Sequence, residues 1–155
     1  MPRFHLSLGS NLEPERHLRV ALRELRTRFG ELQVSSVYES AAVGFVGPPF
    51  WNLAAGLRTG LDAETLNEWL HALEAREGRV RGGARYADRT LDIDIVAIDG
   101  ITLERPELRE AFVLVPLGEI APAVLQPHSG KTIGELRSQI ANAPLKKLDV
   151  RLEDE

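Results

Sequence analysis

The first thirty residues show two successive patterns of apolar positions. Residues 4–8 alternate apolar and polar side chains, which predicts a short strand with one buried face. A helical period follows, with Asn11 expected as its cap, Pro14 in its first turn and Gly30 as its stop. The apolar residues at helical spacing are Leu18, Ala21, Leu22, Leu25 and Phe29.

The pattern then alternates again between strands and a helix. Residues 33–38 and 52–58 predict two strands, joined by a loop with two glycines and two adjacent prolines. Asp62 is the expected cap of a second helix, which Gly78 ends. Residues 91–98 predict a further strand. The buried stripe of the second helix is expected at Leu66, Trp69, Leu70 and Leu73.

The predicted order of elements is strand, helix, strand, strand, helix, strand. This order is typical of the ferredoxin-like α+β fold, a βαββαβ core with helices on one face of an antiparallel sheet. A C-terminal extension follows, with a short helix expected at 133–140. Residues 145–152 fit either an added strand or a frayed end. Because no repeat or long linker interrupts the chain, we expect residues 1–155 to form one domain.

Composition narrows the possible functions. The net charge of −4 at pH 7 argues against nucleic acid as a partner, since such binding needs a basic surface. The chain has no cysteine, which excludes disulfides, thiolate metal sites and cysteine nucleophiles. No apolar run approaches the roughly 18 residues of a membrane span, and the N-terminus turns polar too early for a signal peptide. We therefore expect a cytoplasmic protein with no membrane contact.

Positive charge is concentrated in one short segment. Four arginines lie within residues 79–89: Arg79, Arg81, Arg85 and Arg89. On an acidic protein, such a loop favours a small anionic ligand over a long polyanion. A solvated basic turn explains the segment equally well.

The sharpest chemical signal is the pair of aspartates in residues 91–95. On a strand, Asp92 and Asp94 lie on one face about 7 Å apart, with Leu91, Ile93 and Ile95 on the other. Aspartate is uncommon in strands and like charges repel, so a cation is expected nearby. Magnesium prefers carboxylate oxygens together with substrate phosphates. The alternative is a solvated strand face balanced by arginines.

The neighbouring arginines favour the magnesium interpretation. Arg89 precedes Asp92 by three residues, so metal ligands and guanidinium groups adjoin, as phosphoryl transfer requires. The chain lacks a Gly-x-x-x-x-Gly-Lys-Ser/Thr motif, and it is therefore not a P-loop enzyme.

An aromatic residue and an amide are combined at the start of the strand predicted for residues 52–58. Phe50 and Asn52 share one face, an arrangement that can stack on and hydrogen-bond to a flat heterocycle. Core packing beside a turn asparagine is the simpler explanation. Among the histidines, we expect His5 within a strand or the core, His17 exposed on the first helix, and His71 either near the site or at the surface.

Taken together, these motifs resemble the 6-hydroxymethyl-7,8-dihydropterin pyrophosphokinase family of folate biosynthesis. Their order and spacing match the family over most of the chain, and the combination is specific although no single motif is. The matching segments are LSLGSN at 6–11, SSVYES at 35–40, WNLAAGL at 51–57, GRVR at 78–81, RTLDIDIV at 89–96 and AFVLVPLGEIAP at 111–122.

The resemblance implies binding of MgATP, then of the pterin, and pyrophosphate transfer to the hydroxymethyl oxygen. Asp92 and Asp94 match magnesium ligands for two ions, and Arg79 and Arg89 match arginines that stabilise the transferring phosphates. The positions that match nucleotide contacts are His71, Glu74, Arg81, Tyr86, Ile95, Arg105 and Arg109. The positions that match pterin contacts are Ser40, Ala41, Val43, Phe50, Asn52, Tyr86 and Phe112.

Some positions depart from the family pattern. Residues 85–89 read Arg-Tyr-Ala-Asp-Arg where Arg-Trp-Gly-Pro-Arg is usual, and Arg105 replaces a nucleotide-contacting histidine. Glu110 stands where a phosphate-binding arginine is usual, with Arg109 as a possible substitute. Two functions follow: an active, monomeric pyrophosphokinase, or a catalytically weak paralogue that binds pterin or nucleotide as a regulatory module.

Overall fold

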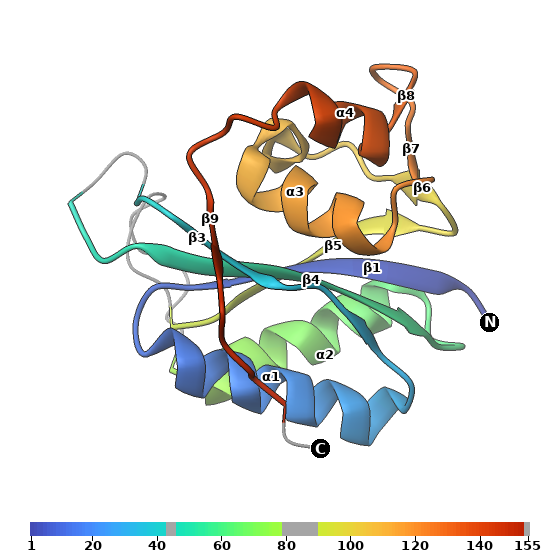
Figure 1. The fold of residues 1–155 in the computed structure, drawn as a ribbon. Helices are drawn as coiled ribbons and strands as arrows, with labels where there is room; N and C mark the ends of the chain where they lie inside the picture. The colour runs from blue at the N-terminus through green and yellow to red at the C-terminus, as the bar shows by residue number, and fades with distance from the viewer. Residues whose placement is uncertain (43–45, 79–89, 154–155) are drawn as a thin grey trace.

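The computed structural model describes all residues except 43–45, 79–89 and 154–155. Its elements form three layers, with one sheet between two pairs of helices (Figure 1). The predicted α+β class is confirmed, but helices cover both faces of the sheet and not the single face that we expected. The helices of the described part are α1 (Pro14–Phe29), α2 (Ala63–Arg76), the 3-10 helix η1 (Pro106–Arg109), α3 (Ala111–Ile120) and α4 (Ile133–Gln139).

The centre of the sheet has the strand order β5-β1-β4-β3, and all its pairings are antiparallel. This order confirms the ferredoxin-like core. The expected strand at 33–38 is divided in two, because Ser35 bonds across to β4 through both its backbone and its hydroxyl group. The strands of the core are β1 (Arg3–Ser10), β2 (Gln33–Val34), β3 (Val37–Ser40), β4 (Phe50–Arg58) and β5 (Asp92–Ile98).

The C-terminal extension lengthens the sheet at both edges. β6 (Ile101–Thr102), β7 (Leu125–Gln126) and β8 (Lys131–Thr132) continue beyond β5, and the β6–β7 pairing is parallel. At the other edge, β9 (Lys146–Leu148) pairs with β3. The segment 145–152 therefore contains an added strand, followed by an irregular tail.

Helices α1 and α2 pack on the face that holds the larger core. Their predicted stripes are buried, together with alternate residues of the central strands such as Leu6, Leu8 and Ile93. Phe29 and Trp69, one from each helix, meet edge to face with ring centroids 5.0 Å apart. Apolar residues at helical spacing on two helices and at strand spacing on the sheet thus form one core.

Helices α3 and α4 pack on the opposite face over a second core. Ala54, Val96 and Ala97 of the sheet contribute to it, together with Val113 and Leu117 of α3. The pairing of β5 with β1 shifts register between His5 and Leu6 and skips Val96, so the adjacent Val96 and Ala97 both join this core.

Glu119 of α3 fastens strand β3 to this second layer. One of its carboxylate oxygens accepts hydrogen bonds from the Ser36 backbone N–H (2.8 Å) and the Ser36 hydroxyl (3.1 Å). Its other oxygen accepts from the Tyr38 hydroxyl, and Arg137 of α4 donates to that same hydroxyl at 3.4 Å. The position of β3, and of the residues at its end, therefore depends on α3 and α4.

The predicted helix ends are partly confirmed. The Asp62 side chain caps α2 by accepting from the Thr65 N–H at 2.8 Å, and Gly30 ends α1 with a φ of 82°. Asn11 does not cap α1: Glu13 occupies that position without a side-chain bond, and the Asn11 amide donates to the Pro48 carbonyl at 3.1 Å. This contact across the sequence gives the asparagine a tertiary partner that local pattern does not reveal.

The expected exposure of His17 is wrong. Its side chain is buried on α1, with Nδ1 2.9 Å from the Glu77 carboxylate at the end of α2. The expected placement of His5 is confirmed, since it lies buried in β1.

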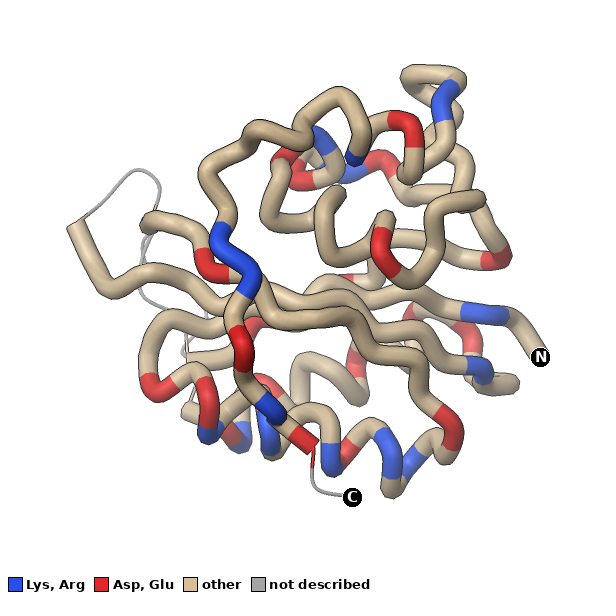
Figure 2. Tube along the Cα trace, viewed as in Figure 1, with Lys and Arg blue, Asp and Glu red and all other residues tan. Residues whose placement is uncertain are grey.

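Charged residues of the described chain lie mainly around the sheet. Figure 2 shows both signs along α1 and the C-terminal segment, while the central strands are mostly uncharged. Asp92 and Asp94 are therefore unusual among the charged residues, because they lie on a central strand.

No helix of the described part is long and apolar enough to cross a membrane.

We expect Leu70→Ala in α2 and Leu117→Ala in α3 each to lower the free energy of unfolding by about 2–5 kcal/mol. Both side chains are fully buried, one in each core. Urea denaturation followed by tryptophan fluorescence and circular dichroism measures this. If residues 1–155 form one domain, each variant shifts a single transition; a separate early transition in Leu117→Ala would contradict this. Leu125→Ala, at an exposed leucine, is the control.

Candidate active site at one end of the sheet

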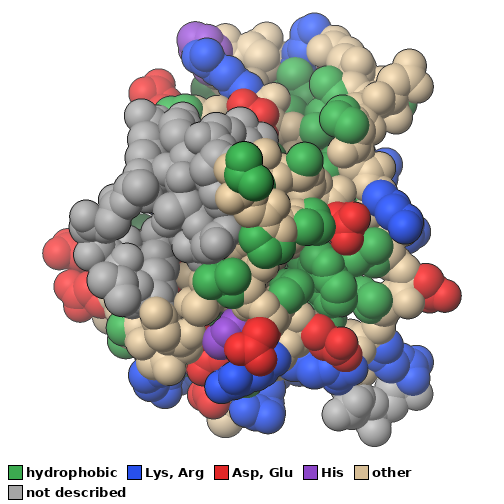
Figure 3. Space-filling view, turned by 90° about the vertical axis from the view of Figure 1, so that its left-hand side faces the viewer, with side chains coloured by type: hydrophobic (Ala, Val, Ile, Leu, Met, Phe, Trp, Pro, Cys, Tyr) green, Lys and Arg blue, Asp and Glu red, His purple; other side chains and the backbone are tan. Residues whose placement is uncertain are grey.

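The predicted residues meet at the end of the sheet where β1 finishes and β4 and β5 begin. This end lies at the left of Figure 1 and faces the viewer in Figure 3, where hydrophobic side chains gather above charged ones. Gly9 of β1 is paired with Asn52 of β4 on one side and with Asp92 of β5 on the other. Asn52 and Asp92 thus share a face of the sheet, about 10 Å apart by two strand spacings.

The two aspartates have the alternation that the sequence predicts. Asp92 and Asp94 are half-buried on the face toward α3, while Ile93 and Ile95 are buried beneath α1 and α2. Asp94 is paired with Ser7 of β1, so small residues flank the acidic pair. Both carboxylates therefore remain partly accessible.

The electrostatic surroundings of Asp94 disfavour its charged form. Burial, followed by the negative charges of Asp92, Glu107 and Glu74, raises the pKa of Asp94 to about 7, against the opposing effect of Arg105. Among the described residues, the positive charge of Arg105 does not offset the burial and the neighbouring negative charges. A bound divalent cation would supply positive charge beside Asp94.

The donor set also fits magnesium. Among the described residues, no group of three or more His, Cys, Asp or Glu side chains could hold a metal ion by itself. Magnesium commonly uses one or two carboxylates and takes its other ligands from water and substrate phosphates. A pair of accessible aspartates matches that requirement.

A third charged residue faces the pair from the 3-10 helix. Arg105, directly before η1, places Nη1 3.8 Å from Asp94 Oδ1 and 3.6 Å from Glu107 Oε1. The side chains of Arg105 and Asp94 are about one-third exposed and that of Glu107 about one-quarter, so solvent weakens both ion pairs. Glu107 is a residue that the sequence did not single out, because its proximity to Asp94 depends on the turn before η1.

Asn52 is held in a fixed orientation. It is buried, and its Nδ2 donates to the Tyr38 carbonyl (3.1 Å) and to Ser40 Oγ (2.9 Å) of the neighbouring strand. These bonds leave Oδ1 on the side of Gly9, where a Cβ atom would lie 3.5 Å from it. The Asn52 oxygen is thus an oriented hydrogen-bond acceptor at the site.

Gly9 is the second residue that the sequence left without a role. It lies between the acidic pair and Asn52, and its missing side chain keeps the surface between them low. The Phe50 ring borders the same space, with its Cδ1 3.9 Å from the position of a Cβ at Gly9. The signal was present in the segment LSLGSN, but only strand pairing shows which residues Gly9 separates.

Other residues that match pterin contacts lie near Asn52 and Phe50. Ser40 and Phe50 are paired across β3 and β4, and Ala41 follows as an exposed residue. Phe112, in the first turn of α3, packs half-buried against the second core, on the same side of the sheet as Asn52. Val43 is outside the described residues.

The residues that match nucleotide contacts are more dispersed in the described structure than those that match pterin contacts. Glu74 of α2 is buried, and its Oε2 accepts from the Ile93 backbone N–H at 2.8 Å. Glu74 therefore also anchors the start of β5. The Ile95 side chain is in the core, which leaves only its main chain for a ligand. His71 is half-buried on α2, and Arg109 is exposed on η1. Arg79, Arg81, Arg85, Tyr86 and Arg89 lie outside the described residues.

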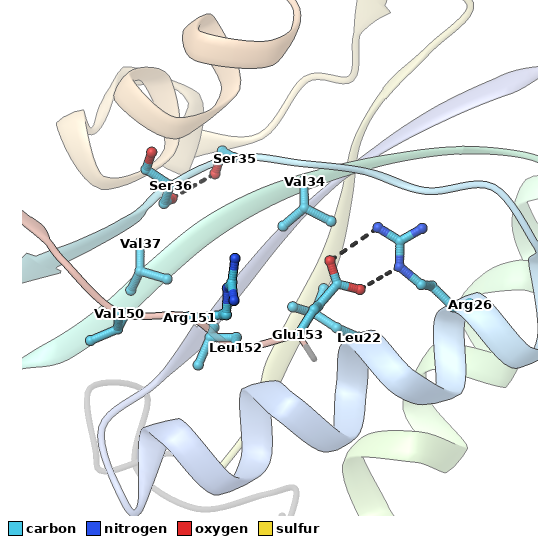
Figure 4. A pocket seen from close by; sticks show the side chains of 10 residues that line it. All are labelled: Leu22, Arg26, Val34, Ser35, Ser36, Val37, Val150, Arg151, Leu152 and Glu153. Carbon is cyan, nitrogen blue, oxygen red and sulfur yellow. Dashed lines mark hydrogen bonds and ion pairs between the residues drawn. The ribbon is translucent and has the colours of Figure 1, made fainter. Parts of the chain in front are cut away.

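A separate cleft of about 440 Å³ lies between α1, the β2–β3 segment and the C-terminal tail (Figure 4). The side chains of Arg26 and Glu153 point toward each other there, and Arg26 Nη2 donates to Glu153 Oε2 at 3.0 Å. None of the predicted site residues lines this cleft. It therefore plays no part in the candidate site.

The fold and site together define a ferredoxin-like α+β protein with an acidic pair and an oriented amide on one sheet face. Comparison with known sequences identifies the family. The sequence profile of 7,8-dihydro-6-hydroxymethylpterin-pyrophosphokinase (HPPK) matches residues 5–122. The chain belongs to this family, as its motifs indicated.

Two curated relatives support the assignment. The chain is 36% identical over 146 residues to the 2-amino-4-hydroxy-6-hydroxymethyldihydropteridine pyrophosphokinase of Synechocystis sp., a match that covers 87% of this chain and 74% of that protein. It is 37% identical over 148 residues to the protein of the same name from Pseudomonas aeruginosa, covering 86% and 89%.

Solved structures agree with the fold. The HPPK-DHPS triple mutant S436F/A437G/A613S of Plasmodium falciparum, with SDX-DHP, aligns at a TM-score of 0.76 and 12% identity over 96% of this chain. An HPPK-DHPS in complex with substrates aligns at 0.72 and 11% identity over 97%. The chain spans only 45% and 49% of those two chains, and the likeness at this identity concerns the fold alone.

We expect Asp94→Asn to change how stability depends on pH in the absence of metal. The native protein holds the Asp94 proton up to about pH 7, whereas the unfolded chain releases it near its ordinary pKa. Asp94 therefore contributes stability that is complete at acid pH and lost as the pH rises toward 7.

Relative to Asp94→Asn, the wild type should lose about 1–3 kcal/mol between pH 4 and 8, less than the full linkage because the side chain is one-third exposed. Denaturation in EDTA at several pH values measures this. Asp149→Asn removes an exposed carboxylate and is the control. Equal pH profiles for wild type and Asp94→Asn would contradict the expected charge imbalance.

Proposed function

We propose that this chain transfers pyrophosphate from ATP to the hydroxymethyl oxygen of 6-hydroxymethyl-7,8-dihydropterin and releases AMP, a step of folate biosynthesis. The carrying observation is that Asp92, Gly9 and Asn52 lie side by side on three strands. An acidic pair for the phosphates and an amide for the pterin then lie about 10 Å apart by two strand spacings. Family membership supports the same reaction.

Asp92 and Asp94 would hold the magnesium that accompanies ATP, with two ions as the family pattern implies. Magnesium bound there would neutralise charge on the nucleotide phosphates. The protein's own task is then mostly to position two substrates, since phosphoryl transfer needs no nucleophilic side chain. Gly9 leaves the space through which the pterin hydroxymethyl group approaches the phosphates.

The pterin is recognised from β3, β4 and α3. The fixed Asn52 oxygen accepts from the ring edge, and the main chain near Ser40, Ala41 and Val43 reads the same edge. Phe50 and Phe112 supply aromatic faces to the ring, because flat heterocycles stack favourably on them. Tyr86, within the arginine-rich segment 79–89, adds a further contact to the pterin.

The nucleotide is bound on the side of β5. Arg79 and Arg89 stabilise the transferring phosphates, and the remaining residues contact the nucleotide. This second set consists of His71, Glu74, Arg81, Tyr86, Ile95, Arg105 and Arg109.

A catalytically weak paralogue that acts as a binding module is the second candidate. The favouring observation is Glu110, an acidic residue directly before α3 where the family pattern has a phosphate-binding arginine. Cytoplasmic location and a monomeric state remain predictions from the sequence.

The deciding measurement is AMP release from ATP, magnesium and the dihydropterin. We expect one AMP per pterin consumed, no product in EDTA, and a loss of roughly 10²–10³-fold in Asp94→Asn, the scale of one lost transition-state charge contact. Asp149→Asn is the matched control. Pterin binding with a non-hydrolysable ATP analogue but no AMP would favour the binding module, and absence of both would contradict the two candidates.

We expect Gly9→Leu to weaken pterin binding roughly 10–100-fold, the effect of about 1–3 kcal/mol of overpacking. Its side chain would enter the space between Asp92 and Asn52. Gly9→Ala is the control, because its Cβ would meet neighbours only at 3.5–3.9 Å, ordinary contact distances. Calorimetric titration with pterin, in the presence of magnesium and a non-hydrolysable ATP analogue, measures the affinity of both variants, and thermal melting shows that both are folded. Unchanged affinity in a folded Gly9→Leu protein would place the pterin elsewhere.

A further inference from the structure

Arg105 has an unusual relation to the acidic centre. Its guanidinium lies between two carboxylates, with Nη1 3.8 Å from Asp94 and 3.6 Å from Glu107. The residue is placed there by the turn that begins η1, where the Arg105 carbonyl accepts from the Leu108 N–H at 3.1 Å. Its main chain is therefore fixed while its long side chain reaches the site.

The guanidinium is held by charge and not by directional bonds. Both ion-pair distances exceed ordinary hydrogen-bond lengths, and no described residue accepts a hydrogen bond from this side chain. Its Nε is buried and has no partner among the described residues. Since a guanidinium has five N–H donors in a fork that matches phosphate oxygens, this arrangement leaves its binding capacity unused.

A divalent cation and the Arg105 guanidinium would compete for the Asp94 carboxylate. The guanidinium balances part of the carboxylate charge in the protein alone, and a metal ion at the same carboxylate would repel it. Glu107 gives the displaced side chain a second anchor close by, since it already lies nearer to Nη1 than Asp94 does. Nucleotide phosphates at the metal would offer the missing acceptor oxygens.

We propose that Arg105 is an exchangeable counter-cation, which balances Asp94 while no metal is bound and transfers to the nucleotide phosphates when magnesium takes that carboxylate. This inference rests on the proposed function. It makes metal binding depend on the nucleotide: metal alone leaves the displaced Arg105 with Glu107 as its partner, whereas metal with nucleotide also provides the arginine with phosphate oxygens. By linkage, the coupling acts equally on both ligands.

The test is Mn²⁺ binding without nucleotide, followed by the electron paramagnetic resonance of free Mn²⁺, with Mg²⁺ as competitor. We expect Arg105→Ala to bind Mn²⁺ roughly 3–10-fold more tightly than wild type, the effect of removing one partly screened like charge. Arg105→Lys keeps the charge and should bind like wild type. Arg23→Ala, an exposed position on α1 across the sheet, controls for net charge.

The second measurement repeats the titration with a non-hydrolysable ATP analogue. The advantage of Arg105→Ala should disappear or reverse there, because the variant cannot contact the phosphates. Unchanged, weaker or undetectable Mn²⁺ binding by Arg105→Ala without nucleotide would overturn the proposal. Arg105→Gln gives the same test if the alanine variant folds poorly. A wild type that releases no AMP refutes the proposed function but leaves this order of metal affinities measurable.

Discussion

The antiparallel pairing of β1 with both of its neighbours is the constraint on which the rest of the site depends. It aligns Asp92, Gly9 and Asn52 in one row across three strands. Opposed residues of an antiparallel sheet share a face, and a shift by one residue would turn each side chain to the other face. The register is set by burial, since Leu6, Leu8 and Ile93 fill the core beneath α1 and α2.

The acidic pair illustrates how a site can be built at some cost to the fold. Burial and the charge of Asp92 favour the protonated form of Asp94, and among the described residues Arg105 opposes this. The same charge imbalance favours the binding of a cation. The ion-pair geometry of Arg105, without hydrogen bonds, makes it a partial and replaceable balance. The raised pKa of Asp94 and the proposed binding of a cation there thus have one electrostatic origin.

The second helical layer connects distant parts of the chain to this site. Glu119 of α3 binds Ser36, which precedes β3, and Tyr38 of β3, and the Tyr38 carbonyl in turn accepts from the Asn52 amide. The turn before η1 brings Arg105 and Glu107 to Asp94. The C-terminal extension therefore covers the second face of the sheet and also orients groups on both sides of the site.

The sequence by itself determined the core fold, the alternation of Asp92 and Asp94 with buried residues, and the family. These properties follow from the local periodicity of apolar residues and from short motifs. Only the tertiary structure decided that α3 and α4 cover the second face, that His17 is buried against Glu77, and that Asn11 contacts Pro48 instead of capping α1. It also decided the positions of Gly9 and Glu107 beside Asn52, Asp92 and Arg105, because strand pairing and the turn before η1 bring together residues that no local pattern relates.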